Sequence, residues 1–200
     1  MENIITPEFR ASYPNIITPK MNDLSKEMEY SVIALFPKGA DLSALKKQAA
    51  DAVKEKWPAG APAGLRSPFR DQGEKVVKDK TTGVAQTGPD GKPVLALGHE
   101  AGAIFMNFKA KQKPGLVGPS NQAIIDPSEI YGGVWLRAQV RAYTYGGPGT
   151  KFTPGVAFGL QNVQKLRDGE PLGGRMKPED AFEPVAGADG TGNADATSIF

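Results

Sequence analysis

Apolar and polar residues alternate most clearly between Val134 and Tyr145, and this period of two predicts a β-strand with two unlike faces. One face is small and apolar and suits a hydrophobic core: Val134, Leu136, Ala138, Val140, Ala142 and Thr144. The other alternates aromatic rings with guanidinium groups and contains no acid: Trp135, Arg137, Gln139, Arg141, Tyr143 and Tyr145. Rings stack on bases and guanidinium groups contact phosphates, so this face is typical of single-stranded nucleic-acid binding. A solvated strand that is aromatic for packing reasons remains the alternative.

A second alternating stretch, residues 103–113, also predicts a strand with one cationic face. Its apolar face consists of Ile104, Met106, Phe108 and Ala110, and its polar face of Phe105, Asn107, Lys109, Lys111 and Lys113. If the two strands share a sheet, their polar faces merge into a groove that combines rings with cations. The alternative is a lysine-rich edge strand whose charges prevent aggregation.

The remaining pattern predicts three further strands and one helix. The strands are residues 9–17, a short edge strand interrupted by Pro14, residues 30–36, a buried strand, and residues 155–166. The helix is expected to have Asp41 as its N-cap and to end before Pro58, with an apolar stripe of Leu42, Leu45, Ala49, Val53 and Trp57. Residues 58–98 are rich in Gly, Pro and Lys and predict a long loop. Several strands with Gly and Pro turns and one helix favour a small barrel or a curled sheet.

Charge divides the chain into two parts. The whole chain has a net charge of only +2, but the last 23 residues, 178–200, contain five acids and no Lys or Arg. The body, residues 1–177, therefore has 24 basic and 17 acidic residues, a net charge of +7. We predict a folded, polyanion-attracting domain over 1–177 and a flexible acidic tail over 178–200, which is too polar to fold by itself. The tail ends in two apolar residues, which predicts a hook for a partner protein built from Asp189, Asp195 and Phe200.

The residues that enzymes and metal sites require are scarce. The chain has no Cys, and its one histidine, His99, lies in GHEAG without the HExxH spacing of a zinc site. No P-loop and no GxSxG elbow is present, and no pair of acids is placed for acid–base chemistry. We therefore expect no catalytic residue, no metal and no cofactor. No apolar run approaches the roughly 18 to 20 residues of a membrane span and no signal peptide is evident, so we expect a cytoplasmic protein without a membrane partner.

Three stretches resemble a bacteriophage family of single-stranded DNA-binding proteins. They are residues 10–16 (RASYPNI), 130–138 (IYGGVWLRA) and 155–174 (GVAFGLQNVQKLRDGEPLGG), and the last is the most specific because a long run matches in register. The resemblance covers residues 8–175. It implies a mainly β OB fold, a five-stranded Greek-key barrel with one or two helices and long loops. It also implies binding of single-stranded DNA with little sequence preference in phage replication, recombination or repair in the host cytoplasm. Phage or host replication proteins are then the expected partners of the tail.

Together these patterns predict one nucleic-acid-binding surface, formed by Trp135, Arg137, Arg141, Tyr143, Tyr145, Phe105, Asn107, Lys109 and Lys111. A virion structural or assembly protein remains open, because Tyr, Trp and Arg are also favoured where protein subunits meet. So does a general module that also binds duplex DNA or RNA, because basic surfaces attract the backbone of every nucleic acid.

Overall fold

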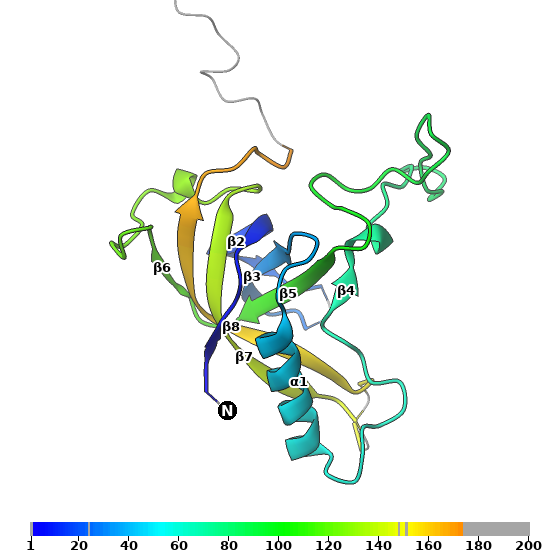
Figure 1. Cartoon of the computed structure of the whole chain (residues 1–200), viewed down its shortest axis with the longest axis vertical. Helices are drawn as coiled ribbons and strands as arrows, with labels where there is room; N and C mark the ends of the chain where they lie inside the picture. Colours follow the sequence, from blue (N-terminus) through cyan, green and yellow to red (C-terminus); the bar gives the residue numbers. More distant parts are fainter. Residues whose placement is uncertain (1, 24, 148, 151, 174–200) are drawn as a thin grey trace, which may run out of the picture.

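The computed structural model describes residues 2–23, 25–147, 149–150 and 152–173, which form mainly β-strands (Figure 1). The strands are β1 (Ile4–Ile5), β2 (Phe9–Met21), β3 (Met28–Leu35), β4 (Arg70–Asp71), β5 (Ile104–Ala110), β6 (Gly115–Val117), β7 (Trp135–Tyr145) and β8 (Gly155–Arg167). The helices are α1 (Ser43–Lys56) and two single 3-10 turns, η1 (Gln72–Glu74) and η2 (Pro127–Glu129).

Five of the strands close into a barrel in the order β2, β3, β5, β8, β7. β7 pairs back onto β2 through Phe9 opposite Leu136 and Arg10 opposite Trp135, which closes the ring. Neighbouring strands are antiparallel except β5 and β8, which are parallel. A five-stranded barrel with one helix is the arrangement of an OB fold, so the predicted fold class is confirmed. The short strands β1, β4 and β6 add to the barrel strands from outside.

The core confirms the alternation expected along β7. Leu136, Ala138, Val140 and Ala142 are all buried inside the barrel. They pack around phenylalanine rings that meet edge to face, with centroids 5.7 to 6.5 Å apart: Phe9, Phe36, Phe108 and Phe158. Each such ring pair contributes about 0.5–1.5 kcal/mol beyond the burial of its area. The apolar face of β7 is therefore committed to the core, and its polar face is left to point outward.

α1 lies against β7 and fixes one side of the barrel (Figure 1). The Gln48 side chain joins the two elements, since its Oε1 accepts a hydrogen bond from the backbone N–H of Ala142 at 2.8 Å. The predicted N-cap was wrong by one residue: the helix begins at Ser43 after Leu42, which makes no side-chain cap. Asp41 instead accepts a hydrogen bond from the Ser43 N–H at 2.9 Å, the short-range contact typical of an Asx turn.

β2 differs from the short edge strand that its proline predicts. It runs for 13 residues and is an interior strand of the barrel wall, paired with β3 on one side and β7 on the other. The strand tolerates Pro14 because its register to β3 shifts between Ser12 and Asn15, so Tyr13 and Pro14 leave the ladder of hydrogen bonds. Tyr13 adopts φ = +47° at this bulge. The bulge therefore lets a proline occupy an interior strand.

A long excursion between β4 and β5, residues 72–103, projects from the barrel at the upper right of Figure 1 and is called the arm below. Short antiparallel pairings hold it together, between Val76 and Leu95 and between Lys78 and Ala85. Gln72 anchors its base. The buried amide Nε2 of Gln72 donates to the carbonyls of Phe36 and Ile104 at 2.9 Å each. The segment predicted as a plain loop is thus an ordered attachment to the barrel.

Candidate nucleic-acid interface

One row of neighbouring residues crosses the outer face of the barrel. The pairing register places Arg141 of β7 beside Gly159 of β8, and Gly159 beside Lys109 of β5. Lys109 then lies beside Ser31 of β3, and Ser31 beside Asn15 of β2. Because Gly159 has no side chain, bare backbone separates the two cations. The row therefore offers positive charge on both sides of an open floor.

Two hollows meet at this floor. One, of about 450 Å³, lies between the end of α1 and β7 and includes Lys56 and Arg141. The other, of about 380 Å³, lies beside β5 and includes Lys109 and Lys111. Both are also lined by Gly159 and Gln161, so they adjoin at β8. We call the two hollows together the central groove; their charged lining residues are Glu55, Lys56, Lys109, Lys111, Lys113 and Arg141.

Tyr143 of β7 lines the central groove, and Tyr145 lies two residues further along the same strand. The Tyr143 side chain is 44% exposed, and its Cδ1 atom would lie 3.9 Å from a Cβ placed on Gly159. Tyr145 is also exposed and covers Gly155, where an added Cβ would come within 2.3 Å of the tyrosine hydroxyl. Burial raises the pKa of the Tyr143 phenol, and the neighbouring Tyr145 and Glu29 raise it further. The phenol therefore stays neutral at physiological pH and adds no negative charge beside a phosphate.

Glu29 of β3 and Glu27, just before β3, reach the cations at and just beyond the end of β5. Lys109 pairs with Glu29, and the Lys111 Nζ lies 2.8 Å from Glu27 Oε2. The hydrogen bond that Lys111 donates to Glu27 raises the pKa of Lys111, and the negative charge of Glu27 raises it further. The predicted polar face contains no acid of its own, but β3 supplies Glu29 and the residues just before β3 supply Glu27. A phosphate that binds these lysines must therefore replace a carboxylate.

If single-stranded DNA binds these lysines, as the sequence predicts, replacing Glu29 by glutamine should tighten that binding. The change removes a competitor for Lys109 and one negative charge from the groove edge. A partly exposed ion pair stabilises the free protein by about 0.2–1 kcal/mol, so affinity should rise about 1.5- to 5-fold at low salt. The gain should shrink as salt screens the charges. Fluorescence titrations of labelled oligothymidylate at two salt concentrations measure it, and Glu55→Gln provides a comparison at the other hollow. Unchanged affinity at low salt would show that Glu29 does not oppose binding.

The first half of β7 has different surroundings. A register shift between Gln139 and Val140 divides the strand. Before it, the Arg137 Nε donates to Gln164 Oε1 at 2.7 Å, and the Trp135 ring is covered by the Arg167 guanidinium, 4.4 Å from the ring centroid. Two hydrogen bonds to Glu8 hold Arg167 in place. Neither Trp135 nor Arg137 lines the central groove, and each is held by contacts of its own.

Phe105 requires a correction, because it is not an exposed ring. Its side chain points away from the core cluster, in agreement with the predicted alternation, but the residue is only 3% exposed. The guanidinium of Arg70 and the Nζ of Lys75 lie 4.9 and 5.2 Å from the ring centroid, and the His99 ring is 6.1 Å away. The arm and β4 thus cover this end of β5. Asn107, two residues further along β5, remains exposed.

Sequence patterns alone did not identify two exposed rings. Phe152 lies in the β7–β8 connection, and Tyr13 at the bulge of β2. Strand alternation cannot select a ring in a turn, and it places Tyr13 in an ordinary strand. The available signals were a Phe after a Gly-rich turn and a Tyr directly before a proline within a strand.

Other predicted features have a limited structural counterpart. The hook residues Asp189, Asp195 and Phe200 lie outside the described residues. Within the described residues, no group of three or more His, Asp or Glu side chains is placed to hold a metal ion. At 14 residues, α1 is shorter than the roughly 20 that a bilayer span requires, and no other helix in the described ranges meets that requirement.

Comparisons with known proteins point to one group. A family model described as the ssDNA-binding protein of Enterobacter phage Enc34 matches residues 2–194. The solved single-stranded DNA-binding protein from bacteriophage Enc34 in complex with ssDNA is 24% identical, covers 86% of this chain and 90% of its own, and has a TM-score of 0.60. The protein gp2.5 of bacteriophage T7, a single-stranded DNA-binding protein, is 15% identical over 93% of this chain and 96% of its own, with a TM-score of 0.55. These structural likenesses show a shared fold. No curated protein sequence matches the chain.

Proposed function

Since this chain belongs to the ssDNA-binding protein family of Enterobacter phage Enc34, we propose that it binds single-stranded DNA in the central groove. The observation that supports this site most directly is the row in which Arg141 and Lys109 flank the bare backbone of Gly159, with Tyr143 beside it. Arg141, Lys109 and Lys111 contact phosphates. Tyr143 and Tyr145 stack on bases, with Asn107 at the groove's edge.

The general behaviour of OB folds supports this placement. They bind oligonucleotides on the face of the second and third barrel strands, between the loops that join strands one to two and four to five. In this barrel those strands are β3 and β5, and the connections are β2–β3 and β7–β8. Lys109 lies on this face, and Tyr145 is the last residue before the β7–β8 connection. Stacking accepts any base, which agrees with binding of little sequence preference.

We propose a non-catalytic role in phage DNA replication, recombination or repair, in the cytoplasm of an infected cell. Competition of single-stranded DNA, duplex DNA and RNA for one labelled oligothymidylate tests this function. Single-stranded DNA should compete at the lowest concentration. Equal competition by duplex DNA would instead indicate a general nucleic-acid-binding module. A large assembly that forms without DNA and is indifferent to it would favour a structural protein.

The acidic tail is proposed to regulate the same surface and to recruit phage or host replication proteins through Asp189, Asp195 and Phe200. Deleting residues 178–200 removes five carboxylates that compete with DNA for the basic body. The truncated protein should therefore bind oligothymidylate more tightly, most visibly at low salt, where screening is weak. Titrations at two salt concentrations measure this change. A full-length variant with the five acids changed to amides should match the truncation, and unchanged affinity of both would contradict the competition.

A further inference from the structure

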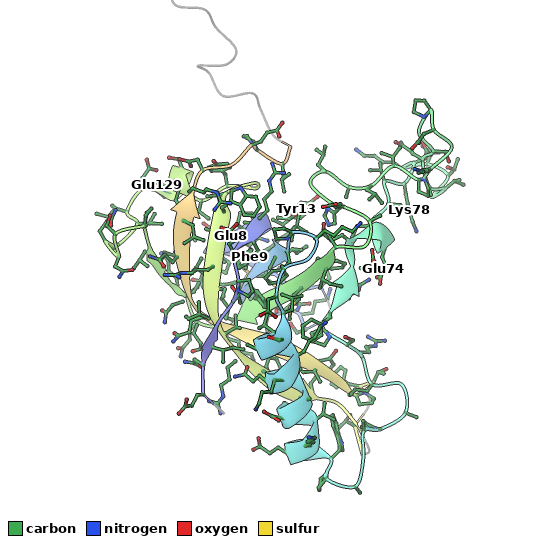
Figure 2. All side chains as sticks on the ribbon, in the orientation of Figure 1. Glu8, Phe9, Tyr13, Glu74, Lys78 and Glu129 are labelled. Atoms are coloured by element: carbon green, nitrogen blue, oxygen red, sulfur yellow. The ribbon has the colours of Figure 1, made fainter. Side chains whose placement is uncertain are left out.

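A third hollow lies between the barrel and the arm, away from the central groove. It has a volume of about 540 Å³ and is lined on the barrel side by Ser12 and Tyr13 and on the arm side by Val77 and Leu97. Figure 2 shows Tyr13 between the barrel and the arm that bears Lys78. We call this hollow the arm cleft. Neither the contacts around Phe105 nor the DNA-binding groove proposed above gives this cleft a role.

Tyr13 presents its ring to solvent at the mouth of the arm cleft. The residue is 73% exposed and has φ = +47°, a backbone conformation that bulky side chains rarely adopt. Proteins retain such conformations chiefly where they position a functional group. Burial does not explain the position of the ring, because most of its surface meets water. Leu97, on the opposite wall, is also 68% exposed. The cleft thus shows two large apolar surfaces that the fold itself does not cover.

The arm cleft continues the outer face that contains the central groove. The row through Arg141, Gly159 and Lys109 ends at Asn15, two residues after Tyr13. Lys109 and Asn15 are separated by two strand spacings, about 10 Å. The Asn15 side chain also donates a hydrogen bond to the Tyr13 carbonyl at 3.2 Å. A strand that leaves the groove over β5 and β3 therefore meets Tyr13 next.

Charge around the arm cleft suits a nucleic acid. No Asp, Glu, Lys or Arg lines the cleft, and His99 is the one basic residue in its lining, so its interior fits an uncharged base. Lys75 and Lys78 lie on either side of the cleft residue Val77 in the sequence of the arm. The Lys75 Nζ lies over the Phe105 ring, whereas Lys78 is exposed and makes no ion pair with any residue that the structure describes. Two nearby acids are occupied: Glu74 pairs with Arg70 at 2.6 Å, and Asp79 accepts the Thr82 N–H at 2.7 Å. Cations beside an uncharged aromatic cleft match a phosphate next to a stacked base.

We propose that the arm cleft is a second base-binding subsite, in which Tyr13 stacks on an unpaired base of the DNA strand that occupies the central groove. Leu97 covers the other side of the base, and the exposed Lys78 attracts an adjoining phosphate. The inference rests on the proposed function and extends its footprint from the barrel to the arm. It implies that only an oligonucleotide long enough to leave the groove reaches Tyr13.

The test is a series of oligothymidylates of about 4 to 20 nucleotides, the range that OB folds occupy, titrated against wild type and Tyr13→Gly. Glycine accepts a positive φ, so this variant removes the ring without adding backbone strain. It should bind long oligonucleotides about 5- to 150-fold more weakly, the loss of one stacked base, and the shortest ones as wild type does. Tyr13→Phe keeps the ring and should behave as wild type. Leu97→Ser should weaken the binding of long oligonucleotides only, because only these reach the arm cleft. The variant should remain folded, since Leu97 is exposed and its loss does not disturb the core.

Two results would overturn the arm-cleft subsite: affinities of Tyr13→Gly equal to wild type at every length, or an equal loss at every length, which would place Tyr13 in the central groove. Thermal melting of each variant confirms that it is folded. Failure of the proposed function looks different, because wild type would then bind no oligothymidylate, or Tyr143→Ala would bind all lengths as wild type does.

Discussion

Replacing Tyr143 by alanine is expected to weaken binding of oligothymidylate about 5- to 150-fold, because one stacked base contributes about 1–3 kcal/mol. The ring is partly exposed beside Gly159 and its hydroxyl stays neutral, so the ring itself presents an uncharged face to a base. The loss should persist at high salt, since stacking does not depend on counterions. Fluorescence titration of a labelled oligonucleotide measures it directly.

Tyr143→Phe is the matched control, because it keeps the ring and removes only the hydroxyl. Its binding free energy should lie within a few tenths of a kcal/mol of the wild-type value, about the error with which the effect of a single contact can be assigned. Trp135→Ala is the contrasting variant. The Trp135 ring is already covered by Arg167, so its removal should affect binding less than removal of Tyr143. A greater loss in Trp135→Ala than in Tyr143→Ala would move the stacking site to the first half of β7.

Removing Lys109 and Arg141 together is expected to flatten the salt dependence of binding. Each lost phosphate contact on a single strand lowers the slope of log affinity against log salt by about 0.7, so two contacts lower it by about 1.4. Between about 50 and 200 mM salt, wild-type affinity should then fall about 7-fold more than that of Lys109→Ala/Arg141→Ala. The effect is local because both cations border the same floor at Gly159.

Two comparisons separate contact from net charge. Lys46→Ala/Lys47→Ala removes the same charge from the exposed part of α1 and should leave the slope nearly unchanged. Adding Glu29→Gln to the groove variant removes the carboxylate that Lys109 otherwise neutralises. This triple variant should recover some affinity at low salt and keep the flat slope. If the groove variant and the α1 variant have equal slopes, Lys109 and Arg141 do not contact phosphates.

The alternation of β7 was the most reliable information in the sequence. It placed Leu136 and Val140 in the core and Arg141 and Tyr143 outside, because a buried face leaves a strand only one register. Alternation also identified β5 and its outward lysine at position 109. The OB fold was predicted from the resemblance to a known family, and the strand order of the barrel confirms that fold.

The remaining features depend on contacts between distant segments, which periodicity does not record. Phe105 has the correct orientation but is covered by the arm, whose sequence gives no strand or helix period. The outward face of β5 contains no acid, but the neighbouring β3 brings Glu29 to Lys109. Tyr13 is exposed because a bulge interrupts β2, and a proline was the only sequence signal for it.

The division of β7 into two surroundings was also hidden in the sequence. Its whole polar face shows one pattern, yet the register shift after Gln139 separates Trp135 and Arg137 from Arg141 and Tyr143. A bulge re-aims the residues on either side of it, so an unbroken pattern does not guarantee one continuous surface. The proposed binding face therefore includes a shorter part of β7 than the pattern predicts. It extends instead across the neighbouring strands of the barrel.

The most direct test of the central groove is photochemical cross-linking of the full-length protein to an oligothymidylate that contains bromodeoxyuridine, followed by mass spectrometry of the joined peptides. We expect cross-links at Tyr143 and Tyr145, on the half of β7 beside Gly159, and their loss when unlabelled oligothymidylate is added in excess. Cross-links confined to Trp135 and its neighbours, with none at Tyr143 or Tyr145, would contradict it.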